Sequence, residues 1–167
     1  MILRSRPALC RLTKELQEQL ECLGWVANQV GAAVRGRSPT AFSSLEQAGL
    51  LHYVQSFYAG VEDILLQVLA EVDHFASGDR NWGKEVLRRM AQDLPGVRPA
   101  VLSRPLYERL DACRRFCAGA RLCGDARPVT QELFAMALEL PDIHTAFAAE
   151  VEAFLDYLWR AGECPEG

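Results

Sequence analysis

Three arginines, Arg114, Arg115 and Arg121, lie in one short stretch of the chain and are its best candidates for binding an anion. A guanidinium group binds a phosphate through two parallel hydrogen bonds, so such a cluster is typical of contact with a phosphate or another anion. The alternative is that these arginines pair with acids close to them in the sequence, which are Glu108, Asp111 and Asp125.

The stretch belongs to a basic segment, Arg80 to Arg127, which carries 11 Lys/Arg and five Asp/Glu. This segment has a net charge of +6 in a chain of net charge −4, so the remainder carries −10. Such asymmetry indicates either an anion-binding face or a solvated face whose charges are offset by acids folded beside it.

A second spacing that could do chemistry is the Glu-x-x-His of Glu71 and His74. Residues three apart on a helix share a face, and di-iron bundles use this spacing. Such a site needs a second copy, but neither His52 nor His144 has a glutamate three residues before it. We therefore predict no metal and no cofactor, with His74 a surface residue at a helix end. Motifs for a nucleophilic serine or a phosphate-binding glycine loop are also missing from the sequence.

The cysteines and the distribution of apolar residues indicate the cellular compartment of the protein. None of the six cysteines forms a Cys-x-x-Cys pair, so we interpret all of them as small apolar residues: Cys10, Cys22, Cys113, Cys117, Cys123 and Cys164. No run of about 18 apolar residues and no signal-peptide core is present. We expect a cytoplasmic protein that makes no membrane contact.

Apolar residues recur at steps of three and four along most of the chain, which predicts helices and no strand. The first helix starts at about Leu9 and ends near Gly36, and a capping-box pattern at Ser43 or Ser44 begins a long central helix that runs to about Ala76. A third helix ends at Pro95-Gly96. The aromatic residues of these and later helices are expected in the core: Phe57, Tyr58, Trp82 and Phe116.

Three more helices complete the prediction. Ser103 caps the fourth, which should stop at Gly124; a fifth follows Pro128, and Pro141 opens a last one. The chain is thus predicted to be all-α, an antiparallel helical bundle of about five to six helices. No internal repeat is present, so we expect a single domain over residues 1–167.

Several stretches resemble the HepT-like branch of the HEPN superfamily. They are Asn81-Trp82, Met90 to Pro99, Leu110 to Gly124, and His52 to Asp73, the last with Glu62 at the acidic position of that branch's central helix. The resemblance covers about Ser44 to Trp159. Its most specific part is the spacing from the Asn-Trp pair through Leu-Pro-Gly-Val-Arg-Pro to the arginine-rich helix. It implies a small α-helical dimer of the RNase-toxin type, encoded beside an MNT-type nucleotidyltransferase antitoxin.

The active-site motif of that branch is degenerate here. The family motif is Arg-x4-His-x-Tyr at the dimer interface, and the positions aligned with its three residues hold Cys117, Leu122 and Gly124. RNA cleavage without a metal needs a proton acceptor and a cation or hydrogen-bond donor for the phosphorane, and none of these three residues supplies either. The catalytic residues are therefore unknown, and Gly124 also removes the tyrosine that the antitoxin would modify.

Two functions follow as hypotheses. The first is a HepT-like dimer that has lost its nuclease site and serves as an interaction module for protein or, weakly, for RNA. The second is a ribonuclease toxin whose site is rebuilt from Arg114, Arg115 and Arg121 with an acid such as Glu62 or Asp111. The homodimer is expected to use the arginine-rich helix through its small residues, Ala118 to Ala120, unless these face a neighbouring helix of the same chain.

Overall fold

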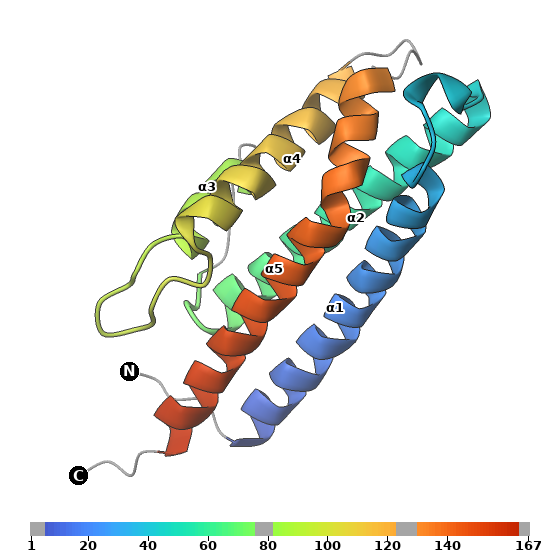
Figure 1. The fold of residues 1–167 in the computed structure, drawn as a ribbon. Coiled ribbons are helices and arrows are strands. Elements are labelled where there is room, and N and C mark those ends of the chain that lie inside the picture. The colour runs from blue at the N-terminus through green and yellow to red at the C-terminus, as the bar shows by residue number, and fades with distance from the viewer. Residues whose placement is uncertain (1–5, 76–81, 123–129, 164–167) are drawn as a thin grey trace.

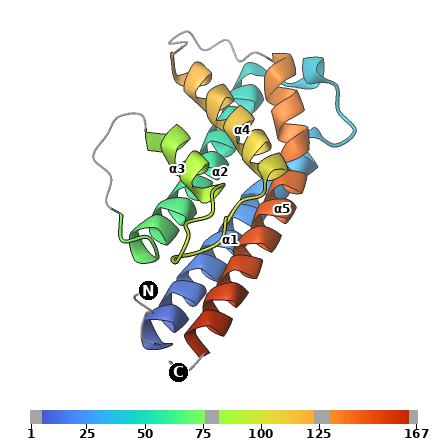
Figure 2. The same ribbon diagram turned by 90° about the vertical axis from the view of Figure 1, so that its left-hand side faces the viewer.

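The computed structural model describes residues 6–75, 82–122 and 130–163, apart from the side chains of residues 121, 122, 130, 162 and 163. Within these ranges the chain forms five α-helices and one turn of 3-10 helix, and no strand. The four long helices follow one another in the order α1, α2, α4 and α5, and each runs antiparallel to the one before it. The short α3 lies beside α4 (Figures 1 and 2). The predicted all-α antiparallel bundle is confirmed.

The first two helices form a hairpin. Helix α1 spans Arg6–Val34, a short 3-10 helix spans Pro39–Ala41, and α2 spans Ser44–Glu71. Ser43 is the residue that caps α2: its hydroxyl accepts from the backbone N–H of Glu46 at 3.3 Å, and the Glu46 carboxylate accepts from the Ser43 N–H at 2.8 Å. The predicted capping box is therefore present, and it fixes where the second helix begins.

Helix α2 is the centre of the bundle and contacts α1, α3, α4 and α5. Nine of its residues are buried, among them Phe57 and Tyr58, which confirms their predicted core role. The helix ends at Glu71, before the predicted end near Ala76, and Val72 is its C-cap residue. His74 has a φ of 52° and is exposed, as predicted for an end-of-helix surface residue.

Helix α3 spans Trp82–Met90 and so ends before the predicted stop at Pro95-Gly96, which instead lies in a tight turn made by Leu94-Pro-Gly-Val. The N–H of Val97 donates to the carbonyl of Leu94 at 2.9 Å, and Gly96 has a φ of 77°. A proline followed by a residue of positive φ is the signature of a type II turn, in which glycine avoids a steric clash. The Pro95-Gly96 pair thus reverses the chain and presents Arg98 to the interior.

Arg98 is a buried charged residue, with its side chain 0% exposed. Its Nε and Nη2 donate to the two carboxylate oxygens of Asp73 at 2.6 and 2.8 Å. The remaining N–H groups donate to backbone carbonyls of Arg89, Gln92 and Pro99. The motif Leu-Pro-Gly-Val-Arg-Pro therefore ties the link between α3 and α4 to the end of α2.

The last two helices are α4, Arg104–Leu122, and α5, Thr130–Glu163. The predicted break at Pro141 is wrong, because α5 continues through this proline. A proline inside a helix removes one backbone hydrogen bond. Leu140 and Ile143 on either side of it are fully buried, and the Pro141 ring packs against Gly31 of α1, so core packing holds the helix together across the proline.

The cysteines divide between core and surface. Cys113 and Cys117 are buried thiols, as expected of small apolar residues, whereas Cys10 and Cys22 on α1 are exposed thiols. They lie on the side of α1 that faces solvent, away from the stripe of leucines that packs on α2 and α5. Cys123 and Cys164 lie outside the described residues. None of the described helices has an apolar stretch of the length needed to cross a membrane.

Candidate functional site

Helix α4 carries Cys117 and Leu122, two of the three residues that the motif alignment singles out, and α5 fixes where this helix starts. Ser103 caps α4, since its hydroxyl accepts from the N–H of Leu106 at 3.4 Å. Glu150 of α5 in turn accepts from the backbone N–H and from the hydroxyl of Ser103, at 2.7 and 2.5 Å. The predicted cap at Ser103 is confirmed, and the register of α4 against α5 is set by this carboxylate.

The inner face of α4 is apolar where the family motif has its arginine. Leu106, Leu110, Cys113 and Cys117 follow one another at steps of three and four and are all buried, with Cys117 3% exposed. The pKa of the Cys113 thiol is raised because it is hydrogen-bonded to Cys117 and because it is buried. Both thiols thus act as small apolar groups in the core, and neither is a cation at any pH.

Two of the three candidate arginines are paired with a single acid. The Nε of Arg114 lies 2.9 Å from one carboxylate oxygen of Asp111, and the Nε of Arg115 lies 3.2 Å from the other. The Arg114 side chain is 22% exposed and that of Arg115 67%. The structure therefore favours the alternative in which acids close in sequence pair with these arginines, and Arg115 is the more accessible of the two.

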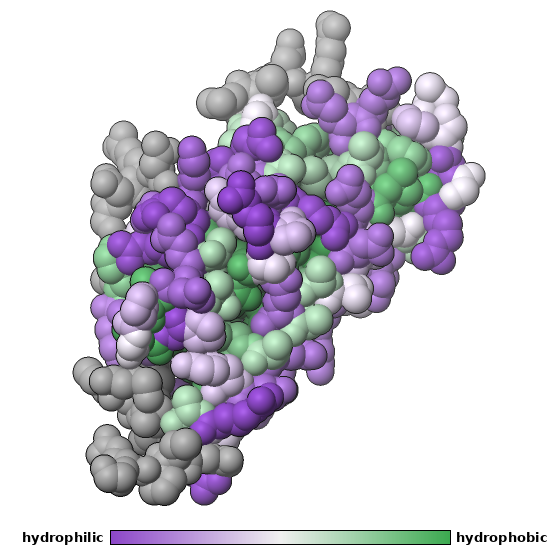
Figure 3. All heavy atoms as spheres, turned by 60° about the vertical axis from the view of Figure 1, so that its left-hand side comes forward, coloured by the Kyte–Doolittle hydropathy of each residue, from purple (hydrophilic) through white to green (hydrophobic). Residues whose placement is uncertain are grey.

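Three other arginines of this surface are also paired with acids close to them in the sequence. Arg88 and Arg89 pair with Glu85, and Arg104 pairs with Glu108 at 2.7 Å. Arg88 lowers the pKa of Glu85 to about 2 by hydrogen bonds to its carboxylate. Purple, hydrophilic side chains cover much of α3 and α4 in Figure 3, with green apolar patches between them. The described part of this face is mixed in charge.

A polar grouping lies where α2, α3 and α4 meet. Glu62 approaches Gly83 so closely that a Cβ on this glycine would stand 2.6 Å from the Glu62 Oε1 and 3.4 Å from the Cδ of Arg114. Burial raises the pKa of Tyr58, the negative charge of Glu62 raises it further, and Arg114 opposes the shift. The structure therefore brings together Glu62 and Arg114, two of the predicted site residues.

This grouping also contains residues that sequence reasoning did not assign to a site. Tyr58 was predicted only as a core aromatic, and Gly83 has no signal in the sequence beyond its place next to Trp82. The Oη of Tyr58 and the Nε1 of Trp82 are buried and have no hydrogen-bond partner among the described residues. Buried polar atoms without partners are uncommon, so these two atoms distinguish this region from the apolar packing around it.

Two of the three small residues of α4 face outward. Ala118 and Gly119 are exposed, and an added Cβ on Gly119 would meet nothing within 4 Å among the described residues, whereas Ala120 is half-buried. The exposure of Ala118 and Gly119 therefore counts against the alternative in which these small residues pack against a neighbouring helix of the same chain. The side chains of Arg121 and Leu122, the residue Gly124, and the predicted helix stop there lie outside the described residues.

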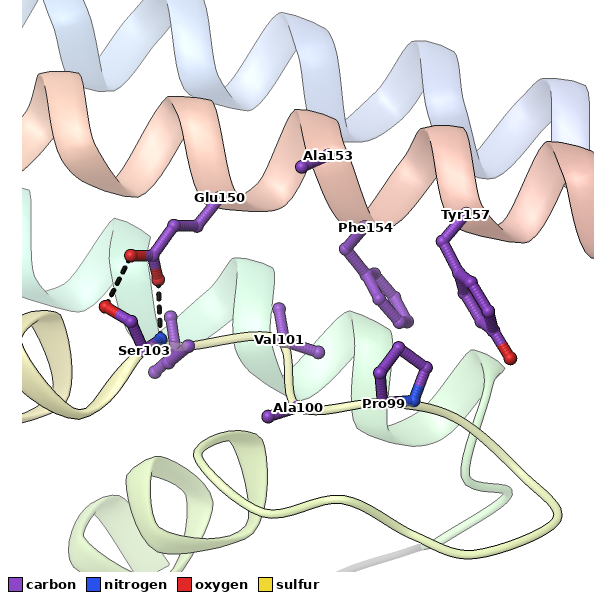
Figure 4. A pocket seen from close by; sticks show the side chains of 9 residues that line it. Pro99, Ala100, Val101, Ser103, Glu150, Ala153, Phe154 and Tyr157 are labelled. Carbon is purple, nitrogen blue, oxygen red and sulfur yellow. Dashed lines mark hydrogen bonds between the residues drawn. The ribbon is translucent and has the colours of Figure 1, made fainter.

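A shallow apolar pocket separates α5 from the link between α3 and α4 (Figure 4). Its volume is about 350 Å³, and Pro99, Phe154 and Tyr157 lie together at one end of it. Among the described residues, three polar side chains line it: Tyr157, and Ser103 and Glu150, which are hydrogen-bonded to each other. The pocket contains none of the predicted site residues.

The Glu71 and His74 spacing does not form a metal site, because the helix ends at Glu71 and His74 adopts a left-handed conformation. The two side chains therefore do not share a helical face. Among the described residues, no three His, Cys, Asp or Glu residues are close enough together to hold a metal ion.

This fold and site define a class of protein. It is a helical bundle whose arginine-rich fourth helix packs on a long central helix. The family model described as HepT-like protein matches residues 49–158, about two thirds of the chain. The chain therefore belongs to the HepT-like family. No curated protein and no solved structure matches it.

Proposed function

We propose that this HepT-like protein is catalytically degenerate and acts as a dimeric interaction module of a toxin–antitoxin type system in the cytoplasm. One observation carries the proposal: Cys117, at the position that the resemblance gives to the catalytic arginine, is 3% exposed and packs in the core beside Cys113. A neutral, buried thiol neither contacts RNA nor stabilises a phosphorane.

The rest of the motif supports the same proposal. Leu122 has no proton acceptor, and Gly124 has neither a phenol nor any other side chain. General acid–base catalysis contributes about 10²–10⁴-fold to a rate, and electrostatic stabilisation of the transition state about as much again. Because Asp111 already pairs with Arg114 and Arg115, these arginines are poor replacements for the missing cation.

Dimerisation through α4 is the interaction we assign to this module. Ala118 and Gly119 expose backbone that a second α4 can approach closely, and the structure offers no intrachain partner for them within the described residues. A nucleotidyltransferase antitoxin, if it is the partner, must act by binding, since no tyrosine remains at position 124 for it to modify. RNA contact is expected to be weak and electrostatic, through Arg115 and Arg121.

The test is an RNA cleavage assay on the purified protein beside the double variant Arg115→Ala/Arg121→Ala. Arg104→Ala is the matched control, because Arg104 is an exposed arginine of the same helix outside the motif. We expect no cleavage by any of the three proteins, and RNA binding that disappears as salt is raised. Robust cleavage by the parent and the control that is lost in the double variant would overturn the proposal.

The proximity of Glu62 to Arg114 favours one alternative, an active ribonuclease with a rebuilt site. In that case Glu62 serves as the proton acceptor and Arg114 as the cation, beside the buried hydroxyl of Tyr58. The variant Glu62→Gln keeps the shape of the side chain and removes its charge. The control is Asp63→Asn, on the exposed side of the same helix. Cleavage of RNA by the parent and by Asp63→Asn, but not by Glu62→Gln, would support the rebuilt site.

A further inference from the structure

Two thiols lie in contact on the inner side of α4. Cys113 and Cys117 are four residues apart on the helix, are 0% and 3% exposed, and are hydrogen-bonded to each other. The proposed function uses neither of them, because the dimer surface assigned to this helix is on its outer side. Two sulfur atoms in contact are a ligand pair, since sulfur binds soft elements in preference to hard ones.

The spacing of the pair disfavours the simplest reaction of two cysteines, which is oxidation to a disulfide. A disulfide holds its two Cβ atoms about 3.5–4.5 Å apart. Residues four apart on an α-helix hold theirs about 5–6 Å apart. A direct bond between the sulfurs would therefore distort α4, whereas a bond from each sulfur to one shared atom fits the helix as it stands.

The surroundings of the pair restrict which atom the sulfurs can share. Among the described residues, no group of three His, Cys, Asp or Glu side chains could complete a zinc site. The pKa of the Cys113 thiol is raised by its hydrogen bond with Cys117, by burial and by the negative charge of Glu139. Thiolates, which a metal ion requires, are therefore costly here. The reagent that fits reacts with neutral thiols and leaves a neutral product.

We propose that Cys113 and Cys117 form a binding site for trivalent arsenic, taken up as arsenous acid. Arsenous acid, As(OH)3, is a neutral molecule in neutral water, and its arsenic is soft and binds sulfur. Two S–H bonds and two As–O bonds break, while two As–S bonds and two O–H bonds form, so two water molecules leave. No atom is oxidised or reduced and no charge enters the core, and one hydroxyl group stays on the arsenic.

Tyr58 offers a hydrogen-bond partner to that remaining hydroxyl group. Tyr58 is 5% exposed on α2, which packs against α4, and its Oη has no partner among the described residues. Burial raises its pKa, and negative charge on either thiol of the pair would raise it further, so its phenol lies near both sulfurs. A buried hydroxyl without a partner is destabilising, so a hydrogen bond to the As–OH group would offset part of the cost of inserting arsenic.

The pair is close to an end of its helix, which gives a small molecule a way in. Helix α4 ends at Leu122, little more than one turn beyond Cys117, and helix ends open locally more often than helix centres. Gly119, between the two, weakens the last turns because glycine is a poor helix former. The site is independent of the proposed function, since neither dimerisation nor RNA contact uses a thiol.

The test uses a variant whose only thiols are the pair. This two-thiol protein carries the changes Cys10→Ser, Cys22→Ser, Cys123→Ser and Cys164→Ser. With arsenous acid it should gain one arsenic per chain in native mass spectrometry, and X-ray absorption should show two sulfur neighbours and one oxygen. The matched controls add Cys113→Ala or Cys117→Ala, and each should bind at least about tenfold more weakly, because one thiol forms one As–S bond and loses the chelate effect.

A second measurement distinguishes a site in the folded protein from thiols that react after unfolding. A ligand of the folded state raises the melting temperature, and a ligand of the unfolded chain lowers it. Arsenous acid should raise the melting temperature of the two-thiol protein and leave that of the two controls unchanged. Tyr58→Phe removes only the hydroxyl group, so it should keep both As–S bonds and bind at least about threefold more weakly.

Four results would overturn the proposal. The first is a two-thiol protein that binds no arsenic, which decides the matter even if a control variant folds poorly. The second is a control that binds as tightly as the two-thiol protein, and the third is a melting temperature that arsenous acid lowers. The fourth is an affinity unchanged by Tyr58→Phe, which would remove the hydroxyl from the site as proposed.

Discussion

Replacing Arg98 by methionine tests whether the most specific part of the family resemblance is structural. Methionine has a similar length and no charge, so the change removes the guanidinium and keeps much of the volume. All five N–H groups of Arg98 are used inside the protein, two of them on the Asp73 carboxylate. The variant leaves Asp73, whose side chain is 3% exposed, as a buried carboxylate without its partner.

The size of the effect follows from that uncompensated charge. Breaking a buried ion pair by removing one partner costs about 3–5 kcal/mol of the free energy of unfolding. Domains of this length have a total stability of about 5–15 kcal/mol, so Arg98→Met is expected to be marginally folded. The double variant Arg98→Met/Asp73→Leu removes both charges and should regain part of the loss, because an apolar pair replaces the ion pair while the backbone carbonyls that Arg98 served still lack their donor.

Urea unfolding followed by far-ultraviolet circular dichroism measures these differences. Arg104→Met is the control, because Arg104 pairs with Glu108 at 2.7 Å with its side chain 83% exposed. Such a surface ion pair contributes about 0–1 kcal/mol. If Arg98→Met costs no more than Arg104→Met, or if the double variant is less stable than the single one, the structural role argued for Arg98 is refuted.

Three further predictions concern α4, the packing of α1 and one exposed ion pair. Cys117→Arg, which restores the family residue, should lower the free energy of unfolding by at least about 3 kcal/mol, because a guanidinium then enters the core. A thermal melt in which Cys117→Arg has the same melting temperature as the exposed control Ala149→Arg would contradict this. Gly31→Ala should be at least about 2 kcal/mol less stable than Gly49→Ala in urea unfolding. Both changes gain similar helix propensity, but only the first drives a Cβ to 2.8 Å from the Pro141 ring. The pKa of Glu85 is lowered from its ordinary 4.5 to about 2 by Arg88, so this pair is intact above pH 4.5 and is lost as the pH falls through about 2. Carboxyl titration by NMR should show that midpoint, and Arg88→Gln should move it up; a midpoint near 4.5 in the parent would disprove the pairing.

The sequence by itself predicted the all-α class, most of the helices and the family. Helices form where apolar residues recur at steps of three and four, and these local patterns predicted the buried stripe of α1 and the central position of α2. The capping box at Ser43 and the Pro95-Gly96 turn are also local, because their partners are only a few residues away. The spacing of the resemblance, from the Asn-Trp pair to α4, predicted the family that the matched residues 49–158 show.

The tertiary structure decided what each functional side chain touches. Arg98 and Asp73 are 25 residues apart, and no local pattern indicates that they form a buried pair. The same holds for Pro141, whose place inside α5 depends on the packing of its ring against Gly31, and for Glu62, which comes to Gly83 and Arg114 from another helix. Spacing along the chain specifies which face of a helix is apolar, but burial and ion pairing depend on neighbours brought from distant parts of the sequence. Only the packed bundle therefore shows that Arg98 lies buried against Asp73 and that Glu62 lies beside Gly83 and Arg114.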